Sequence, residues 1–128
     1  MTKIQSIFSP LRLIKSLGYA IHGIYLLFKG TINARIHFLA VGVTSIAGFY
    51  FAITNLEWLA ILICFAMVLS TEAINTAIEK LCDKINPTFD NNIKEIKDLS
   101  AGAVLITAII SVIIGILIFW PYMAVLMH

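Results

Sequence analysis

The stretch WLAILICFAMVLSTEAINTAIEKLCD, residues 58–83, decides the fold. Its first part, Trp58–Thr71, carries no charge, and acidic residues then follow at helical spacing. A bilayer core about 30 Å thick needs about 20 helical residues, so this stretch spans a membrane only if Glu72 lies inside the bilayer or at its inner edge. The sequence therefore predicts a membrane helix that carries a carboxylate within it.

Two further apolar stretches, residues 36–53 and 101–127, contain no charged residue. The chain as a whole is 60% apolar and 12% charged, whereas soluble domains are about 45–50% apolar and about 25% charged. Such a composition excludes a disordered chain, a nucleic-acid-binding tail and a small disulfide-rich secreted domain. We expect an all-α membrane protein, a single domain over residues 1–128, with spans at about 36–53, 57–83 and 100–123.

The nine Lys and Arg residues fall in two places, before the first span and between the second and third. The connection at 54–57 and the C-terminal tail have none. Because positive residues mark the cytoplasmic side of a membrane protein, we expect a multi-pass protein with its N-terminus in the cytoplasm and its C-terminus outside.

Residues 10–30 have the helical spacing of an amphipathic segment. Arg12, Lys15, Tyr19 and His22 share one face, and the opposite face is aliphatic. A basic amphipathic helix is typical of a segment that lies on the membrane surface. This helix either anchors the chain or also closes a site with its polar face.

The end of the second span carries Glu72, Asn75, Glu79 and Asp83, which are spaced to share one helix face. A carboxylate inside a spanning helix is costly and usually marks function. Such oxygen ligands suit Mg²⁺, which takes one or two carboxylates together with substrate phosphates. The alternative interpretation is a solubilising helix end held by salt bridges, which applies more to Asp83 than to Glu72.

The next segment supplies Lys97 and Asp98 just before the third span. A lysine there can bind an anionic phosphate as a point charge, although Asp98 could simply favour a helix start. The residues alone indicate a carboxylate-rich site that opens to the cytoplasm, with a phosphate-binding lysine nearby.

The runs EAINTAIE (72–79) and KDLSAGAV (97–104), with Asp83 between them, strongly resemble the small bacterial membrane lipid kinases, the diacylglycerol kinase and undecaprenol kinase family. The resemblance covers about residues 11–119. It implies a homotrimer in the bacterial inner membrane, with an N-terminal surface helix, three transmembrane helices per chain and sites shared between subunits. It also implies Mg²⁺-dependent transfer of the ATP γ-phosphoryl group to a membrane lipid alcohol, and no nucleic acid partner.

The resemblance assigns roles to the residues that match the family's motifs. Glu72 would be the catalytic general base and Glu79 a metal ligand. Residues that would bind the nucleotide are Arg12, Tyr19, Asn75, Glu79, Asp83, Lys97 and Asp98. Undecaprenol is the preferred substrate over diacylglycerol, because Asn33, the Ile36-His37 pair and the run 75–77 look more like that branch.

Thr31 departs from the family pattern, because it occupies the position where the family usually has a second metal-binding glutamate. The alternative function is therefore a catalytically impaired member of this fold that binds nucleotide or lipid. A third hypothesis, from another class, is a small ion-conducting oligomer that uses Glu72 as a proton or cation site.

Overall fold

The computed structural model describes residues 10–88 and 90–127. It contains four helices, which are α1 (Pro10–Gly30), α2 (Ile32–Tyr50), α3 (Asn55–Ile85) and α4 (Asn91–Leu126). No strand occurs in these ranges. Helices α2, α3 and α4 are each long and apolar enough to cross a membrane. The predicted fold class, an N-terminal helix followed by three spans, is confirmed.

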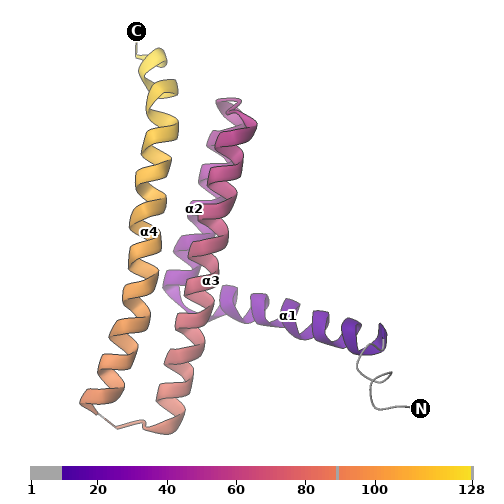
Figure 1. The fold of residues 1–128 in the computed structure, drawn as a ribbon, viewed down its shortest axis with the longest axis vertical. Coiled ribbons are helices and arrows are strands. Elements are labelled where there is room, and N and C mark those ends of the chain that lie inside the picture. Colours follow the sequence, from indigo (N-terminus) through magenta and orange to yellow (C-terminus); the bar gives the residue numbers. More distant parts are fainter. Residues whose placement is uncertain (1–9, 89, 128) are drawn as a thin grey trace.

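Figure 1 shows α2, α3 and α4 running alongside one another, while α1 projects sideways from them. Helices α3 and α4 form a long hairpin and make the most extensive contact in the chain. At 1.5 Å per residue, α3 is about 46 Å long and α4 about 54 Å, so both exceed a bilayer core of about 30 Å. The hairpin end around residues 86–90 therefore extends beyond the level of α1, as Figure 1 shows.

Polar caps set where the three spanning helices begin. The Thr31 side chain accepts the Ala34 amide at the start of α2, and Asp90 accepts two amides at the start of α4. Thr54 and Glu57 form a reciprocal capping box at the start of α3. Each cap satisfies amides that a helix end leaves without partners. Helix α2 therefore begins at Ile32, four residues before the uncharged stretch does.

A small apolar core lies at the end of the bundle opposite residues 86–90. Ile53, Ile61 and Ile118 are buried there. The hydroxyl of Tyr122 on α4 donates a hydrogen bond to Glu57 on α3 at 2.8 Å, which joins the two helices beside this core.

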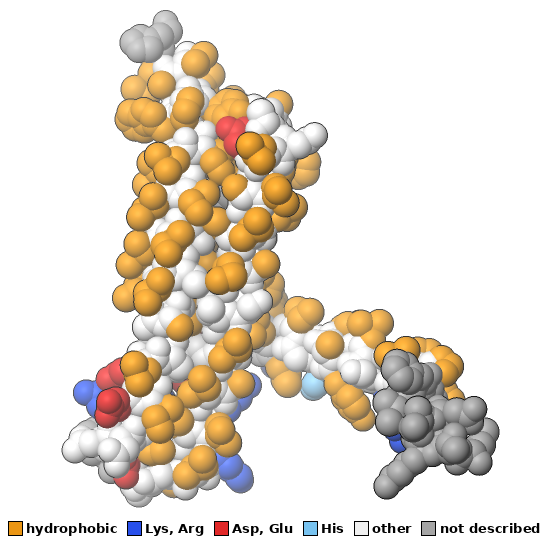
Figure 2. Space-filling model, in the orientation of Figure 1, with side chains coloured by type: hydrophobic (Ala, Val, Ile, Leu, Met, Phe, Trp, Pro, Cys, Tyr) orange, Lys and Arg blue, Asp and Glu red, His pale blue; other side chains and the backbone are white. Residues whose placement is uncertain are grey.

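Most of the apolar surface stays uncovered within one chain, and Figure 2 shows hydrophobic side chains over the whole length of the bundle. In the most apolar 18-residue segment of α4, only 6% of the residues are buried. Apolar area of this extent must be covered by lipid or by other protein chains, as expected of an integral membrane protein.

Candidate active site

Glu72 lies in α3 where the junction between α1 and α2 contacts that helix. It is only 1% exposed, the most completely buried large side chain among the described residues. The Thr31 hydroxyl donates a hydrogen bond to Glu72 Oε1 at 3.0 Å, across 41 positions of sequence. The carboxylate that the sequence predicts within the second membrane helix is thus enclosed by protein.

Two polar atoms beside this contact have no partner among the described residues. They are Glu72 Oε2 and the Thr76 hydroxyl, one helical turn apart on α3. Gly30 lies over Thr76, because a Cβ on Gly30 would be 4.0 Å from the Thr76 methyl group. Buried polar atoms normally have hydrogen-bond partners, so these two mark a place where a polar ligand can bind.

An apolar groove of about 630 Å³ runs between α1 and α3 next to these atoms. Its walls are mainly aliphatic, and Thr76 is one of the few polar residues that line it. Residues on both helices contribute to these walls, among them Ala20, Gly23, Leu27, Leu69, Ala73 and Thr76. The groove provides space for a hydrocarbon chain beside Thr76, one helical turn from Glu72.

Asn75 connects α3 to α4 one turn beyond Glu72. The Ser100 hydroxyl donates to Asn75 Oδ1 at 2.6 Å. The Asn75 amide in turn donates to Glu79 Oε1 at 3.1 Å. Asn75 is buried, whereas Glu79 is half-buried, so this chain of bonds leads from the interior toward water.

Glu72, Asn75, Glu79 and Asp83 form a row of polar side chains along α3. At the water-facing end of this row, Asp83 forms an ion pair with Lys97 on α4, with Oδ1 at 2.9 Å from Nζ. The Asp83 side chain is 67% exposed and the Lys97 side chain 36%, so the pair contributes little to stability. Figure 2 shows basic and acidic side chains gathered at this end of the hairpin. The row from Glu72 to Asp83 therefore passes from a dry interior to a charged, hydrated surface.

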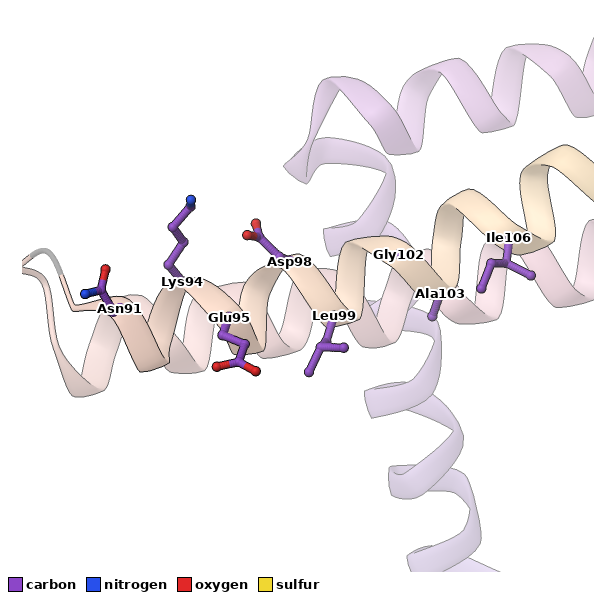
Figure 3. Close-up of a pocket in the computed structure, with 8 residues that line it drawn as sticks. All are labelled: Asn91, Lys94, Glu95, Asp98, Leu99, Gly102, Ala103 and Ile106. Carbon is purple, nitrogen blue, oxygen red and sulfur yellow. The ribbon is translucent and has the colours of Figure 1, made fainter.

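Asp98 does not join this row within one chain. It lies on another face of α4, where it lines an open hollow together with Lys94 and Glu95. Figure 3 shows Lys94 and Asp98 projecting to the same side of the helix. Lys97 pairs with Asp83 on α3, whereas the next residue, Asp98, lies on a different surface of α4.

Arg12 and Tyr19 also lie apart from the row. Both belong to α1 and are exposed, and Figure 1 shows their helix leading away from the hairpin. None of the hydrogen bonds within the described ranges joins either residue to the row.

The donor set fits a Mg²⁺ ion that arrives with a nucleotide. In the described ranges no three His, Cys, Asp or Glu side chains are grouped to hold a metal. Glu79 offers one half-buried carboxylate, and Mg²⁺ usually takes one or two carboxylates with phosphates and water. Thr31 is placed with Glu72, where its oxygen already accepts the Ala34 amide.

Two features of the site were not predicted from the sequence. Ser100 lies within the run 97–104, and its three-residue spacing from Lys97 is the sequence signal that puts both on one helix face. The bond from Thr31 to Glu72 had no sequence signal, since it depends on how the α1–α2 junction meets α3.

Comparisons with known proteins identify the family of this chain. A family model described as prokaryotic diacylglycerol kinase matches residues 18–119. An undecaprenol kinase from Bacillus subtilis is 37% identical over 110 residues, which cover 86% of this chain and 89% of that protein. A diacylglycerol kinase from Synechocystis is 36% identical over 110 residues, covering 80% and 59% respectively. Since the family model spans most of the chain, the protein belongs to the prokaryotic diacylglycerol kinase family.

Proposed function

We propose that the chain transfers the γ-phosphoryl group of ATP to the hydroxyl of a membrane lipid alcohol, with undecaprenol as the preferred acceptor. Membership of a lipid kinase family supports the reaction class. The observation that carries the proposal is Glu72, a carboxylate buried in an apolar helix, whose Oε2 has no hydrogen-bond partner among residues 10–88 and 90–127.

Glu72 is the proposed general base. A carboxylate is expensive to bury in a spanning helix, and the free oxygen Oε2 can accept a proton from a hydroxyl beside it. As the lipid oxygen forms its bond to the γ-phosphorus, the bond from that phosphorus to the leaving oxygen of ADP breaks. The hydroxyl proton passes to Glu72 Oε2.

The nucleotide is proposed to bind at the water-facing end of the same row. Lys97 offers a cation to a phosphate, and Glu79 would hold Mg²⁺ with help from Asn75. The ion would neutralise phosphate charge during transfer. Asp83 forms an ion pair with Lys97 that keeps this lysine directed toward α3. Asp83 would therefore contribute to the nucleotide site by orienting Lys97.

A homotrimer with shared sites would supply the residues that one chain leaves apart. Arg12 and Tyr19 of α1, and Asp98 of α4, face away from the row in their own chain. In such an assembly these residues would complete the nucleotide site of a neighbouring chain.

The proposed orientation places the charged end of the hairpin in the cytoplasm, with the N-terminus inside and the C-terminus outside. The positive-inside rule supports it. ATP then reaches the row from water, while the lipid alcohol approaches Glu72 along the bilayer.

The shape of the groove between α1 and α3 favours undecaprenol over diacylglycerol. The groove is lined mainly by aliphatic side chains, with few donors. Diacylglycerol has two ester groups that lose hydration in such a place, and only Ser70, Thr76 and Lys80 among the lining residues could donate to them. A polyprenol has one hydroxyl and a purely hydrocarbon chain, which matches the groove beside Thr76.

The test is a lipid kinase assay on the purified full-length chain in mixed micelles, with ATP and equal mole fractions of undecaprenol or diacylglycerol. We expect phosphorylated lipid with both, formed faster with undecaprenol, and none when a chelator removes Mg²⁺. A chain that phosphorylates neither lipid contradicts the proposed function. Faster transfer to diacylglycerol contradicts only the substrate preference.

The second candidate function is a non-catalytic member of the family that binds nucleotide or lipid. It is favoured by Thr31, which puts a neutral hydroxyl where the resembled family has a carboxylate. Calorimetric titration with ATP separates the two functions when it is combined with the lipid assay, because an active kinase both binds ATP and forms phosphorylated lipid. Binding of ATP without any lipid product supports this second function.

A further inference from the structure

We infer that Thr31 is a positioning residue for Glu72, whose Oε1 it holds so that Oε2 faces the acceptor hydroxyl. The inference rests on the proposed function, because it concerns the orientation of the proposed base. It differs from a metal-binding role at this position, and the structure offers direct observations in its favour.

The direction of the hydrogen bond follows from what else the Thr31 oxygen does. A hydroxyl has one proton and two lone pairs. Thr31 Oγ1 accepts the Ala34 amide at 3.1 Å as the N-cap of α2. Glu72 Oε1 lies 3.0 Å away as an acceptor, so the single proton goes to the carboxylate. The amide polarises the hydroxyl and thereby strengthens the second bond.

On the Glu72 side, this bond is the one that fixes the carboxylate. Among the described residues, Thr31 alone hydrogen-bonds it, and Oε2 has no partner. A glutamate side chain has several rotatable bonds, and burial alone does not determine which oxygen faces a ligand. Catalytic groups need placement to about 0.5 Å, which a fixed Oε1 provides.

The backbone around Thr31 makes the contact rigid. Ala34, in the first turn of α2, is fully buried, and Gly30 lies over Thr76 of α3. Thr31 itself is extended, with φ −111° and ψ 155°, so the chain turns from α1 into α2 at this residue. Rotation of the Thr31 side chain away from Glu72 would also break the N-cap bond to Ala34, so the cap holds the hydroxyl in place.

Three substitutions distinguish positioning from helix capping and from metal binding. Thr31→Ser keeps both the cap and the donated proton. Thr31→Gly costs a helix start only a few tenths of a kcal/mol in the general case, but it has no hydroxyl. Thr31→Asp is an excellent cap, yet as a carboxylate it has no proton to donate and repels Glu72.

We would measure kcat and the KM for ATP on the full-length chain in mixed micelles with undecaprenol. Thr31→Ser should stay close to wild type. Thr31→Gly and Thr31→Asp should lose about 10- to 100-fold in kcat, the value of one hydrogen bond to a charged group, with the KM for ATP unchanged. Thr54→Ala is the matched control, because it removes an N-cap far from Glu72 and should keep the wild-type kcat.

Results other than these would contradict either this inference or the proposed function, as follows. A Thr31→Gly chain with wild-type kcat means that Thr31 only caps α2. A Thr31→Asp chain that is faster than wild type means that the position binds metal. Should Thr31→Gly fail to fold, Thr31→Asp keeps the cap and decides alone. A wild-type chain inactive on both lipids contradicts the proposed function, whereas an active one with unaffected variants contradicts only this inference.

Discussion

Asn75 joins the buried and the hydrated halves of the candidate site. It accepts the Ser100 hydroxyl from α4 and donates to the Glu79 carboxylate on its own helix. An amide is the side chain that can do both, because it carries an acceptor and two donors. At the scale of single residues, this bridge sets where the proposed magnesium ligand points.

We therefore predict that Asn75→Asp raises the KM for ATP by about 10-fold or more, because a carboxylate cannot donate to Glu79 and adds a like charge beside it. Ser100→Ala is the matched comparison. It removes the bond to Asn75 but leaves the donor to Glu79, so its effect should be smaller. Equal KM values for wild type and Asn75→Asp, measured in the lipid kinase assay, would contradict this role.

The sequence could predict some of these residues but not their partners. Spacing places Glu72, Asn75 and Glu79 on one face of a helix because helix geometry is local. The partners Thr31 and Ser100 come from other helices. Their positions depend on tertiary packing, which no spacing in the sequence encodes.

At the scale of elements, α2 packs tightly against the start of α3 at Gly48. A Cβ on this residue would lie 2.8 Å from two ring atoms of Trp58 and 3.2 Å from the end of Ile53. The Trp58 ring also contacts the Phe49 ring, with centroids 4.9 Å apart and the ring planes tilted by 48°. The ring therefore has little freedom to move away, and the absence of a side chain lets the two helices approach.

Gly48→Ala should consequently destabilise the fold by about 1–3 kcal/mol, the usual cost of overpacking a tight contact. Gly42→Ala, in the same helix, is the matched control, because no atom lies within 4 Å of the added Cβ. Thermal unfolding in detergent, followed by circular dichroism, measures both. Equal midpoints for the two variants would show that α2 and α3 do not meet at Gly48.

Hydropathy predicted where the spans lie more easily than where the helices begin. The first uncharged stretch starts at Ile36, but α2 begins at Ile32 because Thr31 supplies its cap. The length of an uncharged stretch indicates which part of a helix can lie in lipid. The helix itself begins where its first backbone amides find hydrogen-bond acceptors. The turn between α1 and α2, and with it the enclosure of Glu72, therefore could not be predicted from composition.

At the scale of the whole molecule, a single chain has the row from Glu72 to Lys97 but leaves Arg12 and Tyr19 on an arm that leads away from it (Figure 1). If sites are shared between subunits, as we propose, two defective chains can complete one another. In the proposed assembly, the two groups of residues would come from different chains.

We predict that chains with Glu72→Gln and chains with Arg12→Ala, each of low activity alone, regain a measurable fraction of activity when assembled together. Glu72→Gln mixed with Asn75→Asp is the control. Both residues lie in the same row on α3, so this pair should not complement. Restoration in the control mixture, or none in the test mixture, would contradict shared sites of this composition.

The most direct test of the central claim compares ATP binding with lipid phosphorylation in Glu72→Gln. Loss of a general base should lower kcat by about 100-fold or more, while ATP affinity stays near that of wild type, because the nucleotide is proposed to bind further along the row. Glu57→Gln, a carboxyl change at the opposite end of the same helix, should keep wild-type turnover. Full turnover by Glu72→Gln would contradict the account.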